Sequence, residues 1–79
     1  MEKYALSILV ENQGEVLSRI SNLFFRKGYK INSLSFKGTE NPQLSRVDVD
    51  FSSDSQFIDQ IISQIKKVVD VREVVDLIH

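Results

Sequence analysis

Side chains able to carry out catalysis are scarce in this chain. Its one histidine is His79, the last residue, and it contains no cysteine. A nucleophile, its general base and the group that orients the base therefore have few possible members. Asp48 and Asp50 alternate along one predicted strand and could act as paired carboxylates, but a solvated outer strand face accounts for them better. We expect no catalytic residues, no cofactor and no enzymatic activity of the chain itself.

Nucleic acids and metal ions are also poor matches. The net charge is −1, so the chain offers no positive field to a polyanion. The RNA-recognition module stacks bases on aromatic residues of its central strands, whereas the strand predicted at residues 44–51 turns Asp48 and Asp50 outward. A ferredoxin-like metal chaperone needs a Cys-x-x-Cys in its first loop, and the loop here reads Glu11-Asn12-Gln13-Gly14. We therefore expect neither nucleic acid nor metal as a ligand.

That first loop is nevertheless the best candidate for a ligand site. The start of a helix presents unpaired backbone N–H groups and the positive end of its dipole, which suit a carboxylate. Gly14 allows a close backbone approach, and Asn12 is suited both to cap the helix and to reach a ligand. Glu15 stands three residues after Asn12, as in a capping box. The alternative is that Asn12 and Gly14 only cap a helix, and the residue pattern alone leaves both interpretations open.

The elements that position this loop follow from hydrophobic periodicity. Alternating apolar residues predict strands at 4–10, 32–37 and 44–51, and a valine-rich segment predicts a last strand at 71–78. In the second strand, Leu34 and Phe36 are expected to point inward. One helical stripe ends at Gly28, and a second follows Asp54, the expected N-cap. The stripes comprise Val16, Leu17, Ile20, Leu23 and Phe24, and then Phe57, Ile58, Ile61, Ile62, Ile65 and Val68.

The order of elements predicts an α+β fold of the ferredoxin-like βαββαβ type, a four-stranded antiparallel sheet with two helices on one face. We expect residues 1–79 to form a single domain with one thin core. A site shared between two copies is then favoured over a deep private cleft. The sequence has no signal-peptide segment and no long apolar span, so we expect a cytoplasmic protein that does not bind membranes.

Several segments together resemble one known family. The sequence is similar to the opening of the regulatory small subunits of acetohydroxyacid (acetolactate) synthase, and the likeness covers nearly the whole chain without gaps. The Pro-x-Leu-Ser-Arg hairpin, the Leu-Ser-Arg helix and the Gly-Tyr turn are its most specific parts. The matching residues are Leu9–Asn12, Leu17–Ile20, Leu23–Phe24, Gly28–Tyr29, Ile31, Ser33–Leu34, Thr39–Arg46 and Val68–Val71.

The resemblance implies a regulatory ACT domain that forms a homodimer, with the two sheets joined edge to edge. It implies an amino acid, typically valine, between the first loop of one copy and the second strand of the other. It also implies a partner, the thiamine-dependent catalytic large subunit, which the domain activates or places under feedback control in branched-chain amino acid biosynthesis. The ligand-binding residues by this resemblance are Asn12, Gln13, Gly14, Glu15, Val16, Lys30, Ile31 and Asn32.

Two positions depart from the family pattern. In an ungapped match the family's loop glycine falls on Glu15, and the asparagine after its Gly-Tyr turn is Lys30. Glu15 would repel an incoming carboxylate, and Lys30 of one copy would reach Glu15 of the other and fill the ligand slot. We therefore expect valine to bind weakly or not at all. The alternative function is a free-standing ACT-type amino-acid sensor or interaction module with no role in a synthase.

Overall fold

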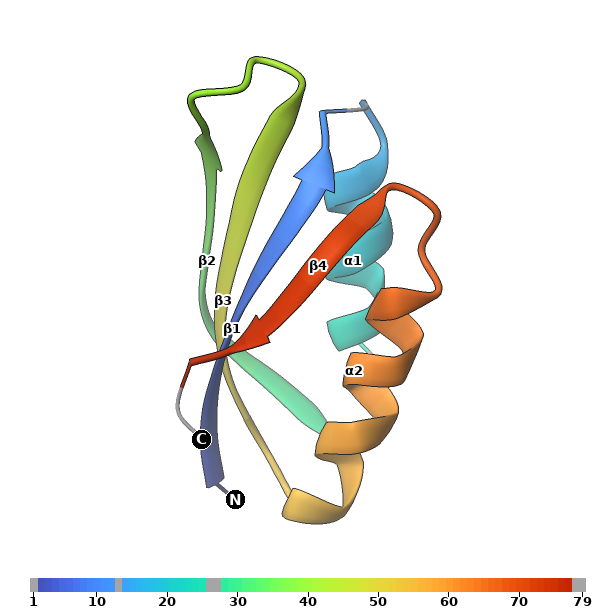
Figure 1. The fold of residues 1–79 in the computed structure, drawn as a ribbon. Helices are drawn as coiled ribbons and strands as arrows, with labels where there is room; N and C mark the ends of the chain where they lie inside the picture. Colours follow the sequence, from blue (N-terminus) through green and yellow to red (C-terminus); the bar gives the residue numbers. More distant parts are fainter. Residues whose placement is uncertain (1, 13, 26–27, 78–79) are drawn as a thin grey trace.

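The elements of the chain follow the predicted order. The structure is a computed structural model that describes residues 2–12, 14–25 and 28–77. Its strands form one antiparallel sheet in the order β2-β3-β1-β4, and both helices cover the same face of that sheet (Figure 1). The expected ferredoxin-like fold is therefore confirmed. The elements are β1 (Glu2–Glu11), α1 (Val16–Phe24), β2 (Tyr29–Gly38), β3 (Leu44–Ser53), the 3₁₀ turn η1 (Ser55–Phe57), α2 (Ile58–Lys66) and β4 (Val71–Asp76).

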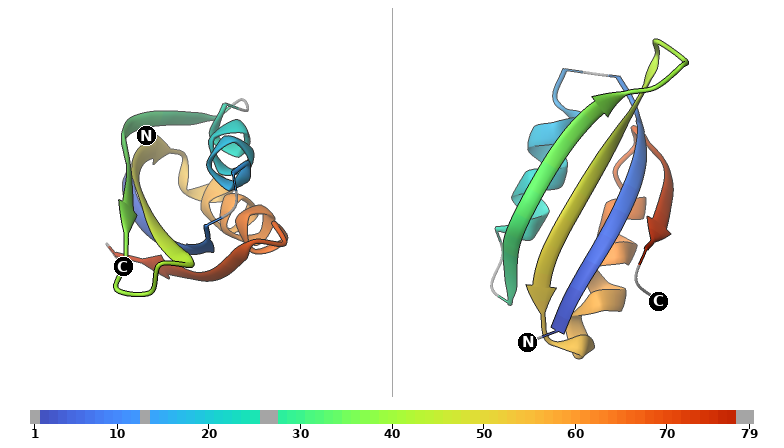
Figure 2. Two further views of the ribbon diagram at one scale, coloured as in Figure 1. Left: turned by 90° about the horizontal axis from the view of Figure 1, so that it is seen from above. Right: turned by 90° about the vertical axis from the view of Figure 1, so that its left-hand side faces the viewer.

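The core lies between the helices and the two central strands. Side chains alternate across a strand, so every second residue of β1 and of β3 points toward the helices. Viewed along the strands, the sheet curves around the two helices, which lie next to each other on its concave side (Figure 2). None of the described elements covers the opposite face of the sheet (Figure 2). The fully buried strand residues of the core are Leu6, Ile8, Val10, Val47, Val49 and Phe51, with Tyr4 almost fully buried beside them.

Each helix contributes one buried stripe to this core. On α1 the stripe consists of Val16, Ile20 and Phe24, which recur every four residues and are at most 1% exposed. The ring of Phe24 meets that of Phe51 edge-on, with 4.9 Å between the ring centroids. Burying apolar side chains of this size stabilises a fold by about 1.5–3 kcal/mol each. The stripe therefore holds α1 against the sheet and fixes the direction in which its first turn points.

Strand β2 forms one edge of the sheet and is largely exposed. Leu34 and Phe36 lie opposite Val49 and Val47, so they share the face on which the core lies. They are nevertheless 38% and 40% exposed, because an edge strand has a neighbour on one side only. The prediction that both point inward is thus right about the face and wrong about burial. The register of β2 shifts at Asn32, between Ile31 and Ser33, as expected for a β-bulge.

The helix starts differ from the predicted caps. The N-cap of α1 is Glu15, which makes no side-chain capping bond, and Asn12 lies outside the helix. Asp54 precedes η1, not α2, and its side chain likewise makes no capping bond. The prediction for Asn12 was therefore wrong. Asp54 is the N-cap residue as predicted, but of η1, which runs directly into α2, and without the expected side-chain bond. No helix among the described residues is long and apolar enough to cross a membrane.

Gly28 lies in the turn between α1 and β2, but α1 ends earlier than predicted, with Phe25 as its C-cap. The φ angle of Gly28 is +103°, a conformation that residues with a side chain rarely adopt. A Cβ atom at this position would also lie 3.2 Å from the ring of Phe57. The glycine is therefore needed twice, for its backbone conformation and for the close approach of η1.

Candidate functional site

The first loop lies at one end of the sheet, beside two other connections. It joins β1 to α1, and at the same end lie the turn between β2 and β3 and the segment between α2 and β4 (Figure 1). The backbone N–H of Asn12 donates to the carbonyl oxygen of Gln43 in the β2–β3 turn, at 2.7 Å. On the other side, the N–H of Glu11 donates to the carbonyl oxygen of Asp70, at 2.8 Å. The backbone at the start of this loop is therefore held by both neighbours.

Asn12 contributes to this arrangement in an unexpected way. Its side-chain amide points toward the β2–β3 turn and makes a long contact of 3.5 Å with the carbonyl oxygen of Pro42. That turn has its own internal bonds, including one of 2.9 Å from the N–H of Gln43 to the side-chain oxygen of Asn41. Asn12 thus joins the first loop to a preformed hairpin turn, where the sequence predicted a helix cap.

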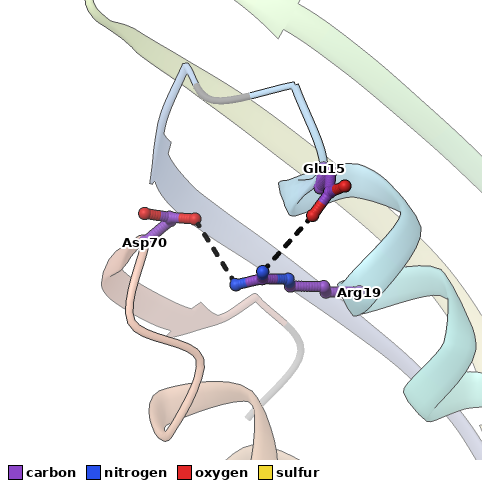
Figure 3. Close-up of polar contacts among 3 residues, drawn as sticks. All are labelled: Glu15, Arg19 and Asp70. Carbon is purple, nitrogen blue, oxygen red and sulfur yellow. Dashed lines mark hydrogen bonds and ion pairs between the residues drawn. The ribbon is translucent and has the colours of Figure 1, made fainter.

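A cluster of three charged side chains lies on the other side of the first loop (Figure 3). Arg19, one turn into α1, lies 3.4 Å from the carboxylate of Glu15 and 4.0 Å from the carboxylate of Asp70. The side chain of Asp70 is only 17% exposed, whereas those of Arg19 and Glu15 are 51% and 82% exposed. Arg19 therefore links the start of α1 to the segment that leads into β4. Its partner Asp70 is largely shielded from solvent, whereas its partner Glu15 is open to solvent.

A cleft of about 410 Å³ lies beside this cluster. It is lined by Gly14, Glu15, Arg19, Val69 and Asp70, so it combines backbone at a helix start with a guanidinium group, two carboxylates and one apolar side chain. Volumes of roughly 300–1,000 Å³ are usual for small-molecule sites. Sequence reasoning missed three of these residues. The spacing of Glu15 and Arg19 as an i, i+4 pair was a detectable signal, but no local pattern places Asp70 or Val69 beside α1.

The structure does not bring the whole predicted ligand set together within one chain. Gly14, Glu15 and the fully buried Val16 lie at the first loop, and Gln13 is outside the described residues. The β2 members of the set lie at the other end of the sheet. Lys30 is level with Lys3 at the start of β1, whereas the loop follows Glu11, so about 26 Å of strand separates the two halves. A site that uses both halves requires a second copy.

The three β2 residues of the set point in different directions. Ile31 packs against the core, and the amide of Asn32 donates to the hydroxyl of Ser52 at 3.0 Å. Lys30 lies opposite Ser52, on the sheet face away from the helices. Glu15 lies at the start of α1 and is already paired with Arg19. A pair between Lys30 of one copy and Glu15 of another stays a prediction.

The other polar groups considered from the sequence lie on the sheet surface. Asp48 is 4.0 Å from Lys37, and Asp50 accepts a 2.8 Å hydrogen bond from the hydroxyl of Ser33. Both aspartates therefore belong to the outer strand face, as expected. His79 lies outside the described residues. Within the part of the chain that the structure describes, no three His, Asp or Glu side chains are grouped closely enough to hold a metal ion.

Comparison with known proteins identifies relatives over nearly the whole chain. Residues 6–73 match the family model described as the AHAS small subunit-like ACT domain. The chain is 42% identical over 72 residues to the acetolactate synthase isozyme 3 small subunit of Escherichia coli K12, covering 91% of this chain and 44% of that protein. It is 37% identical over 73 residues to the acetolactate synthase small subunit of Mycolicibacterium smegmatis, covering 92% of this chain and 43% of that protein.

Solved structures agree with this result. The crystal structure of the acetolactate synthase small subunit of Thermotoga maritima superposes with a TM-score of 0.83 at 34% sequence identity, covering 96% of this chain and 47% of that one. The ACT domain of a GTP pyrophosphokinase from Chlorobium tepidum superposes with a TM-score of 0.80 at 12% identity, covering 95% of this chain and 96% of that one, which shows the shared fold alone. The chain spans less than half the length of the small subunits it matches.

Proposed function

Because this chain belongs to the family of AHAS small subunit-like ACT domains, we propose that it is the regulatory ACT domain of an acetohydroxyacid (acetolactate) synthase small subunit. In this role it has no turnover of its own. It acts by associating with the catalytic large subunit and changing that subunit's activity in branched-chain amino acid biosynthesis. The observation that carries the proposal is the 42% identity over 91% of the chain to a protein named as such a small subunit.

We further propose that two copies pair through β2. The strand is ten residues long and has no neighbour on its outer side among the described elements, and an open edge of this length is a template for pairing. Leu34 and Phe36 stand on this strand with 38% and 40% of their surface exposed. A twofold pairing of the two β2 strands would cover the edges and both side chains in one interface.

Such a pairing also accounts for the separated ligand residues. Strands related by a twofold axis perpendicular to the sheet run antiparallel, so the first half of β2 in one copy lies beside the second half of β2 in the other. The second half of β2 ends at the hairpin turn to which the first loop is bonded. Residues Lys30–Asn32 of one copy would then approach the first loop of its partner. We propose this junction as the amino-acid site of the family, where Glu15 of one copy and Lys30 of the other would weaken the binding of valine.

Reconstitution tests the proposed role directly. Purified catalytic large subunit from the same source is assayed for acetolactate formation with increasing amounts of this chain, with and without valine. We expect a saturable change in the rate on addition of the chain, and no acetolactate from the chain alone. An unchanged rate at saturating chain would favour a free-standing amino-acid sensor or interaction module over a synthase subunit.

A second measurement tests the dimer separately. We expect Phe36→Glu to shift the sedimentation of the protein from dimer to monomer at micromolar concentration, because a charge at the pairing edge cannot be buried without a partner. Leu77→Glu is the matched control, since Leu77 is exposed to 58% and directly follows β4, which forms the opposite edge of the sheet from β2. A native protein that sediments only as a monomer would refute the pairing.

A further inference from the structure

We propose that Arg46, on the sheet face that no described element covers, is a docking residue for a carboxylate of the catalytic large subunit. The partner chemistry is an acidic side chain on a folded protein, surrounded by apolar contacts. This inference rests on the proposed function, because it takes the large subunit as the partner. It extends that function by naming the face of the sheet and the side chain that the partner would contact.

Arg46 lies on the outer face of the central strand β3. Its neighbour Val47 is buried against the helices, so the alternation of side chains along the strand turns Arg46 to the opposite side. On that side it lies opposite Leu9 of β1 and Lys37 of β2. Pairing of two copies through β2 would extend the sheet at its edge and leave this face open. The face is therefore available to a partner in the monomer and in the proposed dimer.

The guanidinium group of Arg46 is anchored across the sheet. One of its terminal nitrogens donates to the hydroxyl oxygen of Ser7, on the neighbouring strand β1, at 2.7 Å. Ser7 is only 5% exposed although it belongs to the uncovered face, and Arg46 itself is half-buried. The guanidinium group is thus ordered before any partner binds, which lowers the entropic cost of binding.

The positive charge of Arg46 has no acidic partner among the described residues. Arg19 and Arg72, the other two described arginines, both form ion pairs within 4.0 Å. Asp48, the next residue along β3 on the same face, is paired with Lys37 at 4.0 Å. A half-buried cation without a counter-charge is unfavourable. A carboxylate supplied from outside the chain would remove this penalty, so the charge of the partner group is specified.

The surroundings of Arg46 suit a protein surface as the source of that carboxylate. A guanidinium group has several N–H donors in one plane, and those not bonded to Ser7 can bind a carboxylate with two parallel bonds. Leu9, beside Arg46, and Val75, beside Ser7, are partly buried apolar side chains on the same face. They would exclude water from the ion pair once a partner is docked. An arginine with apolar neighbours is typical of the residues that dominate protein–protein interfaces.

Binding of the purified large subunit to the native chain and to variants tests the role of Arg46. Affinity is measured by surface plasmon resonance, together with the concentration of chain that gives half of the full change in acetolactate formation. We expect Arg46→Gln to bind about tenfold to hundredfold more weakly, because it removes a charge-assisted contact. Arg46→Lys keeps the charge but not the planar donors, so its affinity should lie between the two. Lys66→Gln is the matched control and should bind like the native chain, since it removes one positive charge from the last turn of α2, on the other side of the sheet.

Stability and sedimentation separate docking from a structural role. Arg46→Gln should sediment as the native protein does, with a similar temperature of unfolding. If it does not fold, Arg46→Lys, which can still donate to Ser7, decides by the same criterion. A changed state of association would place Arg46 between copies of the chain and overturn the proposal.

The binding data also distinguish this proposal from the proposed function. Native affinity in either Arg46 variant, or an equal loss of affinity in Lys66→Gln, would overturn docking at Arg46 and leave the regulatory role intact. A native chain that does not bind the large subunit would refute both.

Discussion

The two adjacent phenylalanines at the end of α1 provide a stringent test of the packing. Phe24 is 1% exposed and Phe25 is 75% exposed. The ring of Phe24 makes edge-on contacts with Phe51 and Tyr29, at centroid distances of 4.9 and 6.1 Å. Each such contact contributes about 0.5–1.5 kcal/mol beyond the burial of apolar area. Phe24→Leu keeps a large apolar side chain but removes both contacts, so we expect a loss of roughly 1–3 kcal/mol in the free energy of unfolding.

This loss is large compared with the stability of a domain of this size. At about 0.05–0.15 kcal/mol per residue, a chain of 79 residues has a total of roughly 4–12 kcal/mol. Urea unfolding followed by far-ultraviolet circular dichroism is a suitable assay. With a slope near 1 kcal/mol per M, the midpoint should fall by roughly 1–3 M urea.

Phe25→Leu is the internal control for the same substitution one residue later. Because that side chain is mostly in solvent, we expect a change of at most about 0.5 kcal/mol. Equal midpoints for the two variants, or a larger loss for Phe25→Leu, would refute the orientation of α1 and the aromatic cluster built on it. A change in slope without a change in midpoint would indicate an effect on the unfolded chain instead.

Two further predictions concern the turn and the first strand. Gly28→Ala should destabilise the fold by roughly 1–3 kcal/mol in thermal unfolding, since it forces an L side chain to a φ of +103° against the ring of Phe57. Gly14→Ala is the control and should have little effect, because no atom lies within 4 Å of the added methyl group. Equal losses of stability in the two variants would contradict this explanation. The hydrogen bond to Glu2, with burial, raises the pKa of Tyr4 from 10.0 to about 12. The folded state therefore favours the neutral phenol of Tyr4. This contribution to stability is complete below pH 10 and lost as the pH rises toward 12. A titration followed by tyrosinate absorbance should show a lower pKa of Tyr4 in Glu2→Gln, and an unchanged pKa would refute the role of Glu2.

Much of the fold was predictable because the apolar face of each element is encoded locally. Alternation along β1 and the four-residue spacing of Val16, Ile20 and Phe24 identify the buried faces without knowledge of their neighbours. The exposure of Leu34 and Phe36 was not predictable in this way. Their alternation is the same as in a central strand, and only the order of strands in the sheet shows that β2 lies at an edge.

The candidate site was less predictable because it depends on contacts between distant segments. Asn12 has the residue type and spacing of a helix cap, yet it is bonded to the β2–β3 turn, about thirty residues later in the chain. Asp70 approaches Arg19 only after α2 has returned the chain to the end of β1. Spacing indicates which residues lie on one element, whereas the partner of a polar side chain is set by the tertiary arrangement.

The central position of β1 has a consequence for how the protein is made. This strand is synthesised before the other described elements, but both of its neighbours, β3 and β4, come much later in the chain. At about 5–20 residues per second, a ribosome leaves the apolar face of β1 without its sheet partners for seconds. Of the described elements that precede β3, α1 is the one that packs on this face. The nascent chain is therefore most vulnerable to aggregation before β3 is complete, and we expect its folding to be limited by these non-local pairings.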